Sequence, residues 1–190
     1  CQYADMIEAF MQRCKYPDQS IISLHVHNDM GMAVASTTQA LMAGAHRVEG
    51  TLFGHGERTG NVDLVTVALN LQYMGIETGL DFSTLPEISR VVADVTQITP
   101  HPRTPYSGEL VFTAFSGSHQ DAIHKGLARM DELAAHFDGW KVPYLHVSPT
   151  AIGREYEKFI RINSQSGKGG IAHVLARDFN VELPRWVQID

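Results

Sequence analysis

The fold is decided by residues 21–53, which read IISLHVHNDMGMAVASTTQALMAGAHRVEGTLF. Residues 21–27 alternate between apolar and polar side chains, and this period of two predicts a strand. Residues 31–45 are small and apolar and predict a helix, whereas residues 47–53 contain β-branched side chains and predict a second strand. Strand, helix and strand in this order indicate parallel βα units.

The flanking segments continue this alternation. Apolar side chains recur at helical spacing in residues 3–14, and a glycine-rich loop leads from the second strand to a helix predicted over residues 62–74. Two strands cannot close a barrel, so we predict that residues 1–78 are the end of a larger α/β domain. We predict that residues 79–190 form mostly helical linker subdomains, with a stiff proline-rich connector at residues 99–105.

Composition excludes several classes of protein. The chain has 190 residues, of which 44% are hydrophobic and 19% charged, and this is typical of a globular protein. The formal charge of −6 argues against nucleic acid as a partner, and no apolar run reaches the roughly 20 residues that cross a bilayer. Two cysteines without a signal peptide suit the cytoplasm. Because the chain begins at Cys1 within a predicted helix, we interpret it as part of a longer protein.

The motif His25-Val26-His27 is the strongest chemical signal. Residues two apart on a strand point the same way, so both imidazoles project at the carboxyl end of the first strand. That end carries the active site in parallel α/β barrels, and two neutral imidazoles can form half of a divalent-metal site. The alternative is a pair of polar residues hydrogen-bonded to nearby loops, and the motif alone does not decide between the two.

The loop after the second strand is the next signal, reading EGTLFGHGERTGN over residues 49–61. Its glycines allow the backbone to approach a ligand closely. Glu57 is a candidate base, Arg58 can pair with it or hold an anion, and the Asn61 side chain offers an oxygen to a metal. A glycine-rich turn with a solvated Glu–Arg pair is the alternative interpretation.

Together these motifs resemble the metal-dependent barrel family of 2-isopropylmalate, homocitrate and citramalate synthases and 3-hydroxy-3-methylglutaryl-CoA lyase. Two later segments are similar to the long-subunit class of 2-isopropylmalate synthases: YSGELVFTAFSGSHQDAI over residues 106–123 and GREYEKFIRINSQSGKGG over residues 153–170. The resemblance covers nearly the whole chain. It implies the last two strands of a TIM (β/α)8 barrel followed by the linker, with the earlier strands and a C-terminal regulatory domain outside this chain.

The resemblance also implies roles for individual residues. His25 and His27 become ligands of a divalent metal, Zn²⁺, Mn²⁺ or Mg²⁺, with Asn61 at or next to it and a further aspartate ligand from the first barrel strand. Glu57, His119 and Tyr156 become the catalytic set, with His119 and Tyr156 supplied by the partner subunit of a homodimer. Taken without the resemblance, His119 reads as a capping or surface residue near the start of a helix predicted over residues 116–137, and Tyr156 as a packed aromatic.

The implied reaction is a Claisen-type condensation of acetyl-CoA with 2-oxoisovalerate (3-methyl-2-oxobutanoate), which gives 2-isopropylmalate for leucine biosynthesis. Two alternatives stay open. The first is a sister enzyme that condenses acetyl-CoA with another 2-oxo acid, as homocitrate and citramalate synthases do. The second is a structural and dimerising segment without catalysis. By itself this chain is expected to be inactive, because the first-strand metal ligand is absent from it.

Overall fold

The computed structural model describes residues 1–114, 116–130, 132, 140–154, 175, 179–181 and 184. The chain divides into two compact units. The first unit contains Cys1–Asp81 and Glu87–Gly108. The second contains Phe82–Pro86 and the described residues from Glu109 onward.

The first unit is built on two short parallel strands, β1 (Ser23–His25) and β2 (Arg47–Glu49), with His25 opposite Glu49. The connection between them is α2 (Ala33–Met42), so the predicted βαβ order is confirmed. Both strands are shorter than the alternation predicted. Beyond them, Val26 and Thr51 hydrogen-bond to Val62, because the segment that precedes α3 runs alongside the ends of both strands.

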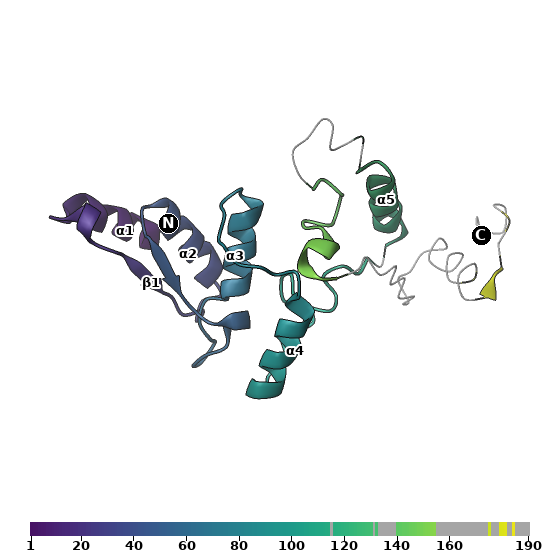
Figure 1. Ribbon diagram of the computed structural model, residues 1–190, viewed down its shortest axis with the longest axis horizontal. Helices are drawn as coiled ribbons and strands as arrows, with labels where there is room; N and C mark the ends of the chain where they lie inside the picture. The colour runs from purple at the N-terminus through teal and green to yellow at the C-terminus, as the bar shows by residue number, and fades with distance from the viewer. Residues whose placement is uncertain are drawn as a thin grey trace. The chain divides into compact units, whose positions relative to one another are not determined.

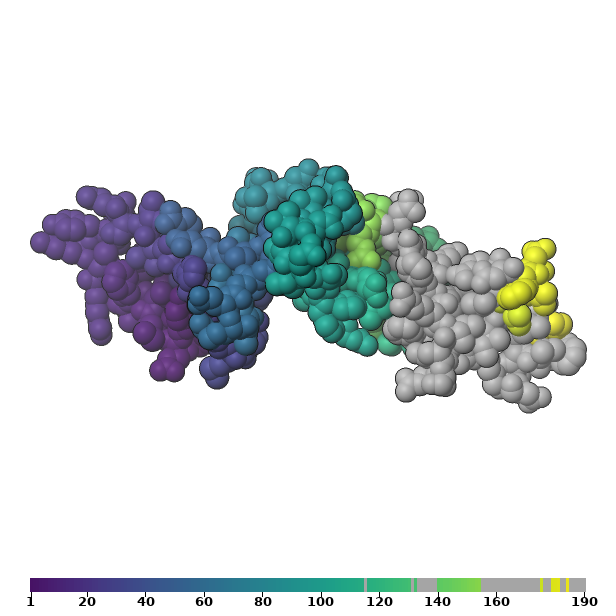
Figure 2. Space-filling view, turned by 90° about the horizontal axis from the view of Figure 1, so that it is seen from below, coloured from purple at the N-terminus to yellow at the C-terminus, as the bar shows by residue number. Residues whose placement is uncertain are grey.

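Three helices accompany the strands, α1 (Gln2–Arg13), α2 and α3 (Leu64–Tyr73). Figure 1 shows them side by side next to β1, with α1 packed on α2 and α2 on α3. Their purple and blue atoms form one continuous body in the space-filling view (Figure 2). The core combines helix and strand side chains, namely Ala33, Val62 and Val67 with Val26, Val34, Leu41, Val48, Leu64 and Leu71 packed against them.

The start of α3 is set by a capping residue. Asp63 is its N-cap, and its Oδ1 accepts a hydrogen bond from the backbone N–H of Val65 at 3.0 Å, while Oδ2 accepts from Thr66 Oγ1 at 2.5 Å. An aspartate at this position satisfies backbone donors that have no partner within the helix. The cap therefore fixes the point at which the loop over residues 54–61 becomes a helix.

Two further helices follow along the chain. The first is α4 (Leu85–Thr96). Helix α5 (Gly117–Ala128) ends at Arg129, whose φ of −112° and ψ of 12° are not helical, so the unbroken helix predicted over residues 116–137 is wrong at this point. Gly126, a poor helix former, is buried against Val142 and Pro143 just before the break. Residues 133–139 lie outside the described residues.

The second unit contains α5 and a 3-10 turn (Pro149–Ile152). None of the helices in the described residues has the length and apolar character that a membrane span requires.

Candidate metal and catalytic site

The carboxyl ends of the two strands are joined by a short backbone ladder. The N–H of Val62 donates to the carbonyl of Val26 at 2.8 Å, and the N–H of Asn28 donates to the carbonyl of Gly60 at 2.9 Å. Between these bonds His27 and Asn61 form an antiparallel bridge. The structure therefore brings the predicted ligands His27 and Asn61 directly opposite each other, although they are far apart in the sequence.

The two histidines lie side by side, as the alternation predicted. Their ring centroids are 5.4 Å apart and the rings meet edge to face. In the described residues, four buried side-chain nitrogen or oxygen atoms have no hydrogen-bond partner: His27 Nδ1, Asn61 Oδ1, His55 Nδ1 and Thr37 Oγ1. A buried polar atom without a partner is unfavourable, and such atoms are rare in folded proteins. Two of the four belong to the predicted ligands.

This donor set fits part of a metal site. A neutral imidazole nitrogen and an amide oxygen are ligands that divalent cations accept, and a bound cation would satisfy the two buried atoms. No cluster of three or more His, Cys, Asp or Glu side chains that could hold a metal ion occurs within the described part of the chain. The candidate ligands that the described residues supply are therefore His25, His27 and Asn61.

Glu49 is a neighbour of the histidine pair that the sequence interpretation did not single out. Its Oε2 lies 3.6 Å from His25 Nδ1, while Oε1 accepts a hydrogen bond from Ser23 Oγ at 2.6 Å. That hydrogen bond, with the nearby Arg47 guanidinium, lowers the pKa of Glu49. A carboxylate beside a ligating histidine commonly orients its ring. The sequence feature that could have identified Glu49 is the register of the two strands, since parallel pairing of residues 23–25 with 47–49 places Glu49 beside His25.

Glycines allow the loop over residues 54–61 to fold tightly against Asn61. A Cβ at Gly56 would lie 3.0–3.1 Å from the side-chain atoms of Asn61. Gly60 has a φ of +90°, and a Cβ there would overlap the carbonyl oxygen of Gly54. These glycines therefore let the loop close around the Asn61 amide, while the predicted close approach of the backbone to a ligand stays a prediction.

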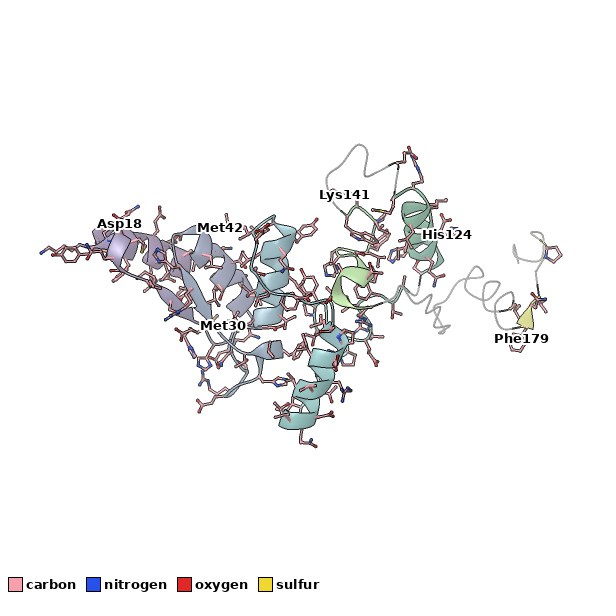
Figure 3. The ribbon with its side chains drawn as sticks, in the orientation of Figure 1. Asp18, Met30, Met42, His124, Lys141 and Phe179 are labelled. Atoms are coloured by element: carbon pink, nitrogen blue, oxygen red, sulfur yellow. The ribbon has the colours of Figure 1, made fainter. Side chains whose placement is uncertain are left out.

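Among the charged side chains of this loop, Arg58 pairs more closely with Asp29 than with its neighbour Glu57. Arg58 directs two nitrogens to Asp29, with Nε to Oδ1 at 2.8 Å and Nη2 to Oδ2 at 2.9 Å. These hydrogen bonds lower the pKa of Asp29 to about 2. Glu57 is 87% exposed and lies 3.8 Å from Arg58 Nη1. Met30, which follows Asp29 and is 88% exposed, marks this edge in Figure 3.

His119 belongs to the second unit, in the first turn of α5. Its ring stacks on Tyr144, with centroids 4.1 Å apart and planes inclined by 26°. Both line a cavity of about 390 Å³ whose other walls are largely apolar, formed by Val111, Phe112, Thr113, Ala114, Ser116, Ile123 and Leu145. A ring that can donate or accept a proton therefore lies at the wall of a ligand-sized cavity.

Tyr144 is the second residue that the sequence interpretation missed. Its φ is +63°, a region that non-glycine residues rarely occupy and that is often found at functional sites. Its ring is 61% exposed although it stacks on His119. The only sequence feature that could have drawn attention to Tyr144 is its position as an aromatic residue directly after Val142 and Pro143. Tyr156, the tyrosine that was predicted, lies outside the described residues.

Two protein families match this chain. Residues 1–92 match the HMGL-like family, and residues 109–176 match the family described as alpha-isopropylmalate synthase, post-catalytic domain-like. The first match contains His25, His27, Glu57 and Asn61, and the second contains His119.

Similarity to individual proteins extends over almost the whole chain. The 2-isopropylmalate synthase of Rhodospirillum rubrum is 55% identical over 188 residues, which are 99% of this chain and 33% of that protein. The 2-isopropylmalate synthase of Alcanivorax borkumensis is 56% identical over 186 residues, 98% of this chain and 33% of that protein. The chain thus spans about a third of the length of the curated relatives it matches. Residues 1–92 are thus similar to the HMGL-like family, and residues 109–176 are similar to the post-catalytic domain family of alpha-isopropylmalate synthase.

Proposed function

We propose that this chain is the part of a 2-isopropylmalate synthase that contains the last two strands of the (β/α)8 barrel and the linker that follows. The complete enzyme would condense acetyl-CoA with 2-oxoisovalerate and hydrolyse the thioester. One observation carries the proposal. His27 Nδ1 and Asn61 Oδ1 are buried without hydrogen-bond partners at the edge where His25 also lies, in a chain that is 55% identical to a protein of that name.

The residues that would hold a divalent cation are His25, His27 and Asn61. Their nitrogen and oxygen donors suit Zn²⁺, Mn²⁺ or Mg²⁺, with a further ligand expected from another strand of the barrel. A bound cation supplies Lewis-acid polarisation of the 2-oxo acid's carbonyl group. Glu49 would keep His25 in its ligating orientation through the 3.6 Å contact with Nδ1.

Proton transfer is assigned to Glu57 and His119. The methyl group of acetyl-CoA is a weak carbon acid, so a positioned base has to accept its proton. Glu57 is solvent-exposed on the loop that also carries Asn61, and the His119 imidazole lies at the wall of a largely apolar cavity. We assign the pair jointly, with one group accepting the proton from carbon and the other donating to oxygen.

A tyrosine hydroxyl completes the proposed set by donating a hydrogen bond to developing negative charge. Tyr156 is the residue that the family resemblance implies. Tyr144 is supported by geometry, because its ring lies 4.1 Å from the His119 ring and lines the same cavity. Replacement of each tyrosine by phenylalanine separates the two, since only the variant that lacks the active hydroxyl should have a reduced kcat.

We further propose that the enzyme is a homodimer in which each site combines His25, His27, Asn61 and Glu57 of one subunit with His119 of the other. The metal-site residues and His119 belong to different compact units of the chain. The proline-rich segment over residues 99–105 lies at the end of the first unit, just before the chain enters the second unit at Glu109. A stiff segment at that place can direct the second unit over a neighbouring subunit.

The experiment is release of coenzyme A from acetyl-CoA by a chain with the complete barrel, measured with three 2-oxo acids. We expect release to be fastest with 2-oxoisovalerate, to stop when the metal is removed by a chelator, and to return when the metal is added back. Preference for pyruvate or 2-oxoglutarate would identify a citramalate or homocitrate synthase instead. A folded, metal-loaded protein that releases no coenzyme A with any of them would show that the segment has a structural role.

A further inference from the structure

We propose that Asp29 and Arg58 form a clamp that positions the Glu57 carboxylate at the edge of the sheet. The two residues are positioning residues, because they act through Glu57 instead of through the substrate. The proposal rests on the role given to Glu57 in the proposed function, and it assigns a purpose to an ion pair that the reaction itself does not use.

The clamp joins two loops at the carboxyl ends of the strands. Asp29 follows β1 and Arg58 follows β2, and the two parallel bonds of 2.8 and 2.9 Å between them are supported by Thr59 Oγ1, 3.3 Å from Asp29 Oδ1. A planar guanidinium bound by two nitrogens to one carboxylate is fixed in orientation as well as in distance. Arg58 is therefore held in one plane.

That orientation determines where Glu57 finds a partner. With Nε and Nη2 of Arg58 bound to Asp29, the remaining nitrogen Nη1 faces the Glu57 carboxylate at 3.8 Å. Among the described residues, this is the one ion pair that Glu57 makes. If the Arg58 guanidinium lost its two bonds to Asp29, its Nη1 atom would no longer have a fixed position. The Glu57 side chain, which is 87% exposed, would then lose its orientation.

The backbone conformation of Arg58 shows that the surrounding loop holds this residue in place. Its φ of 57° lies in the left-handed region, which is unfavourable for residues other than glycine. The bond between the Gly60 N–H and the Glu57 carbonyl, 2.9 Å long, closes the turn around Arg58. The turn and the clamp together hold Arg58 against Asp29 in a backbone conformation that most residues avoid.

The pair contributes little to folding by itself. Arg58 and Asp29 are 55% and 46% exposed, and ion pairs that are this exposed to solvent contribute little to stability. Arg129 and Glu132 form a matched pair in the second unit, also bidentate at 2.9 and 2.6 Å and 61% and 56% exposed. Comparison of the two pairs separates positioning of Glu57 from a general effect of losing a surface ion pair.

The test uses Asp29→Asn, Arg58→Lys and Arg58→Gly in a chain with the complete barrel, with Arg129→Lys as the control. Glycine adopts the φ of Arg58 without strain, so Arg58→Gly removes only the side chain. We expect kcat to fall about 10- to 100-fold in the first three variants, because misplacement of a reacting group by about 1 Å has that effect. Metal affinity and the KM for the 2-oxo acid should change less than about threefold, since the ligands are retained.

Two further measurements distinguish a clamp from a structural effect. The double variant Asp29→Asn/Arg58→Lys should lose no more activity than either single variant, because one interaction can be broken only once. Free guanidinium added to Arg58→Gly should restore part of kcat. Additive losses, or metal affinity that falls together with kcat, would overturn the clamp.

Glu57→Gln separates this proposal from the proposed function. If Glu57→Gln is impaired while Asp29→Asn keeps wild-type kcat, the clamp is wrong and the catalytic role of Glu57 survives. If Glu57→Gln has wild-type kcat, the catalytic role proposed for Glu57 is wrong, and the clamp proposal is then wrong as well. Support requires that Glu57→Gln and Asp29→Asn both lose kcat while Arg129→Lys keeps it.

Discussion

At the scale of single residues, Glu49 tests whether the histidine pair is organised for metal binding. Glu49→Gln keeps the size of the side chain but removes the charge that lies 3.6 Å from His25 Nδ1. Loss of a partner that orients a ligating histidine typically weakens metal affinity 10- to 100-fold. We expect a loss in this range by isothermal titration. Glu87→Gln on α4, exposed like Glu49, is the control, and equal affinities in the two variants would contradict the assignment.

Gly60 tests the closure of the loop around Asn61. Gly60→Ala combines an unfavourable φ with overlap against the Gly54 carbonyl, whereas Gly79→Ala has a similar positive φ of +69° and open space around the new Cβ. We expect Gly79→Ala to lower the free energy of unfolding by about 1–2 kcal/mol from backbone strain alone. Gly60→Ala should cost at least about 1 kcal/mol more because the loop has to shift. Urea denaturation measures both, and equal costs would show that the loop closes without Gly60.

Individual site residues were predictable to different extents. The His25–His27 pair follows from a period of two along a strand, and Asn61 follows from its position after the glycine loop. Arg58 binding to Asp29 did not follow from sequence, because Glu57 is adjacent to Arg58 and Asp29 is 29 positions away. Pairing across loops depends on which backbone segments lie together, and neither composition nor spacing contains that information.

At the scale of elements, the cap of α3 gives a prediction for pH. Burial raises the pKa of Asp63, although hydrogen bonds from Thr66 and Val65 oppose the shift. The folded chain therefore binds this proton more tightly than the unfolded chain, so the contribution to stability is full below the ordinary pKa of 3.8 and is lost as pH rises through the raised value. Relative to Asp63→Asn, which keeps a capping oxygen and cannot ionise, the wild-type chain should lose stability as pH rises from the ordinary pKa of 3.8 toward neutral pH.

The measurement is urea denaturation of the two chains across that pH range. The difference between their unfolding free energies isolates the Asp63 carboxyl, because the other titrating groups are common to both chains. A difference that does not depend on pH, or one that changes in the opposite direction, would contradict the assignment.

Element types were predicted better than their ends. Period and composition identified α1, β1, α2, β2 and α3 in the right order. The strands ended early because residues 61–63 take over the pairing of Val26 and Thr51, which is a long-range effect. The break after α5 was missed because Gly126 reads as a tolerated glycine in a helix until its contact with Pro143 is known.

At the scale of the whole molecule, the shared site predicts complementation between subunits. His25→Ala and His119→Ala should each be nearly inactive. In a mixed dimer, one site carries both defects and the other carries neither. Random mixing at equal amounts makes about half of the dimers mixed, so activity should recover to about a quarter of wild type in a closed two-fold dimer with independent sites.

The control is a mixture of His25→Ala with His27→Ala, in which both sites of every dimer carry a defect in the metal ligands. That mixture should stay inactive. If subunit exchange is verified by native mass spectrometry and the His25→Ala and His119→Ala mixture also stays inactive, the shared site is wrong, and His119 acts in its own subunit or has no catalytic role.

The most direct test of the central claim is the affinity for a divalent cation, measured by isothermal titration on a chain with the complete barrel. Wild type should bind one cation per chain. His25→Ala and His27→Ala should each lose more affinity than the roughly 10- to 100-fold that an orienting partner contributes. His124→Ala, on the exposed side of α5, should bind as wild type does (Figure 3). Unchanged affinity in His25→Ala and His27→Ala would contradict the metal site, and with it the proposed enzyme.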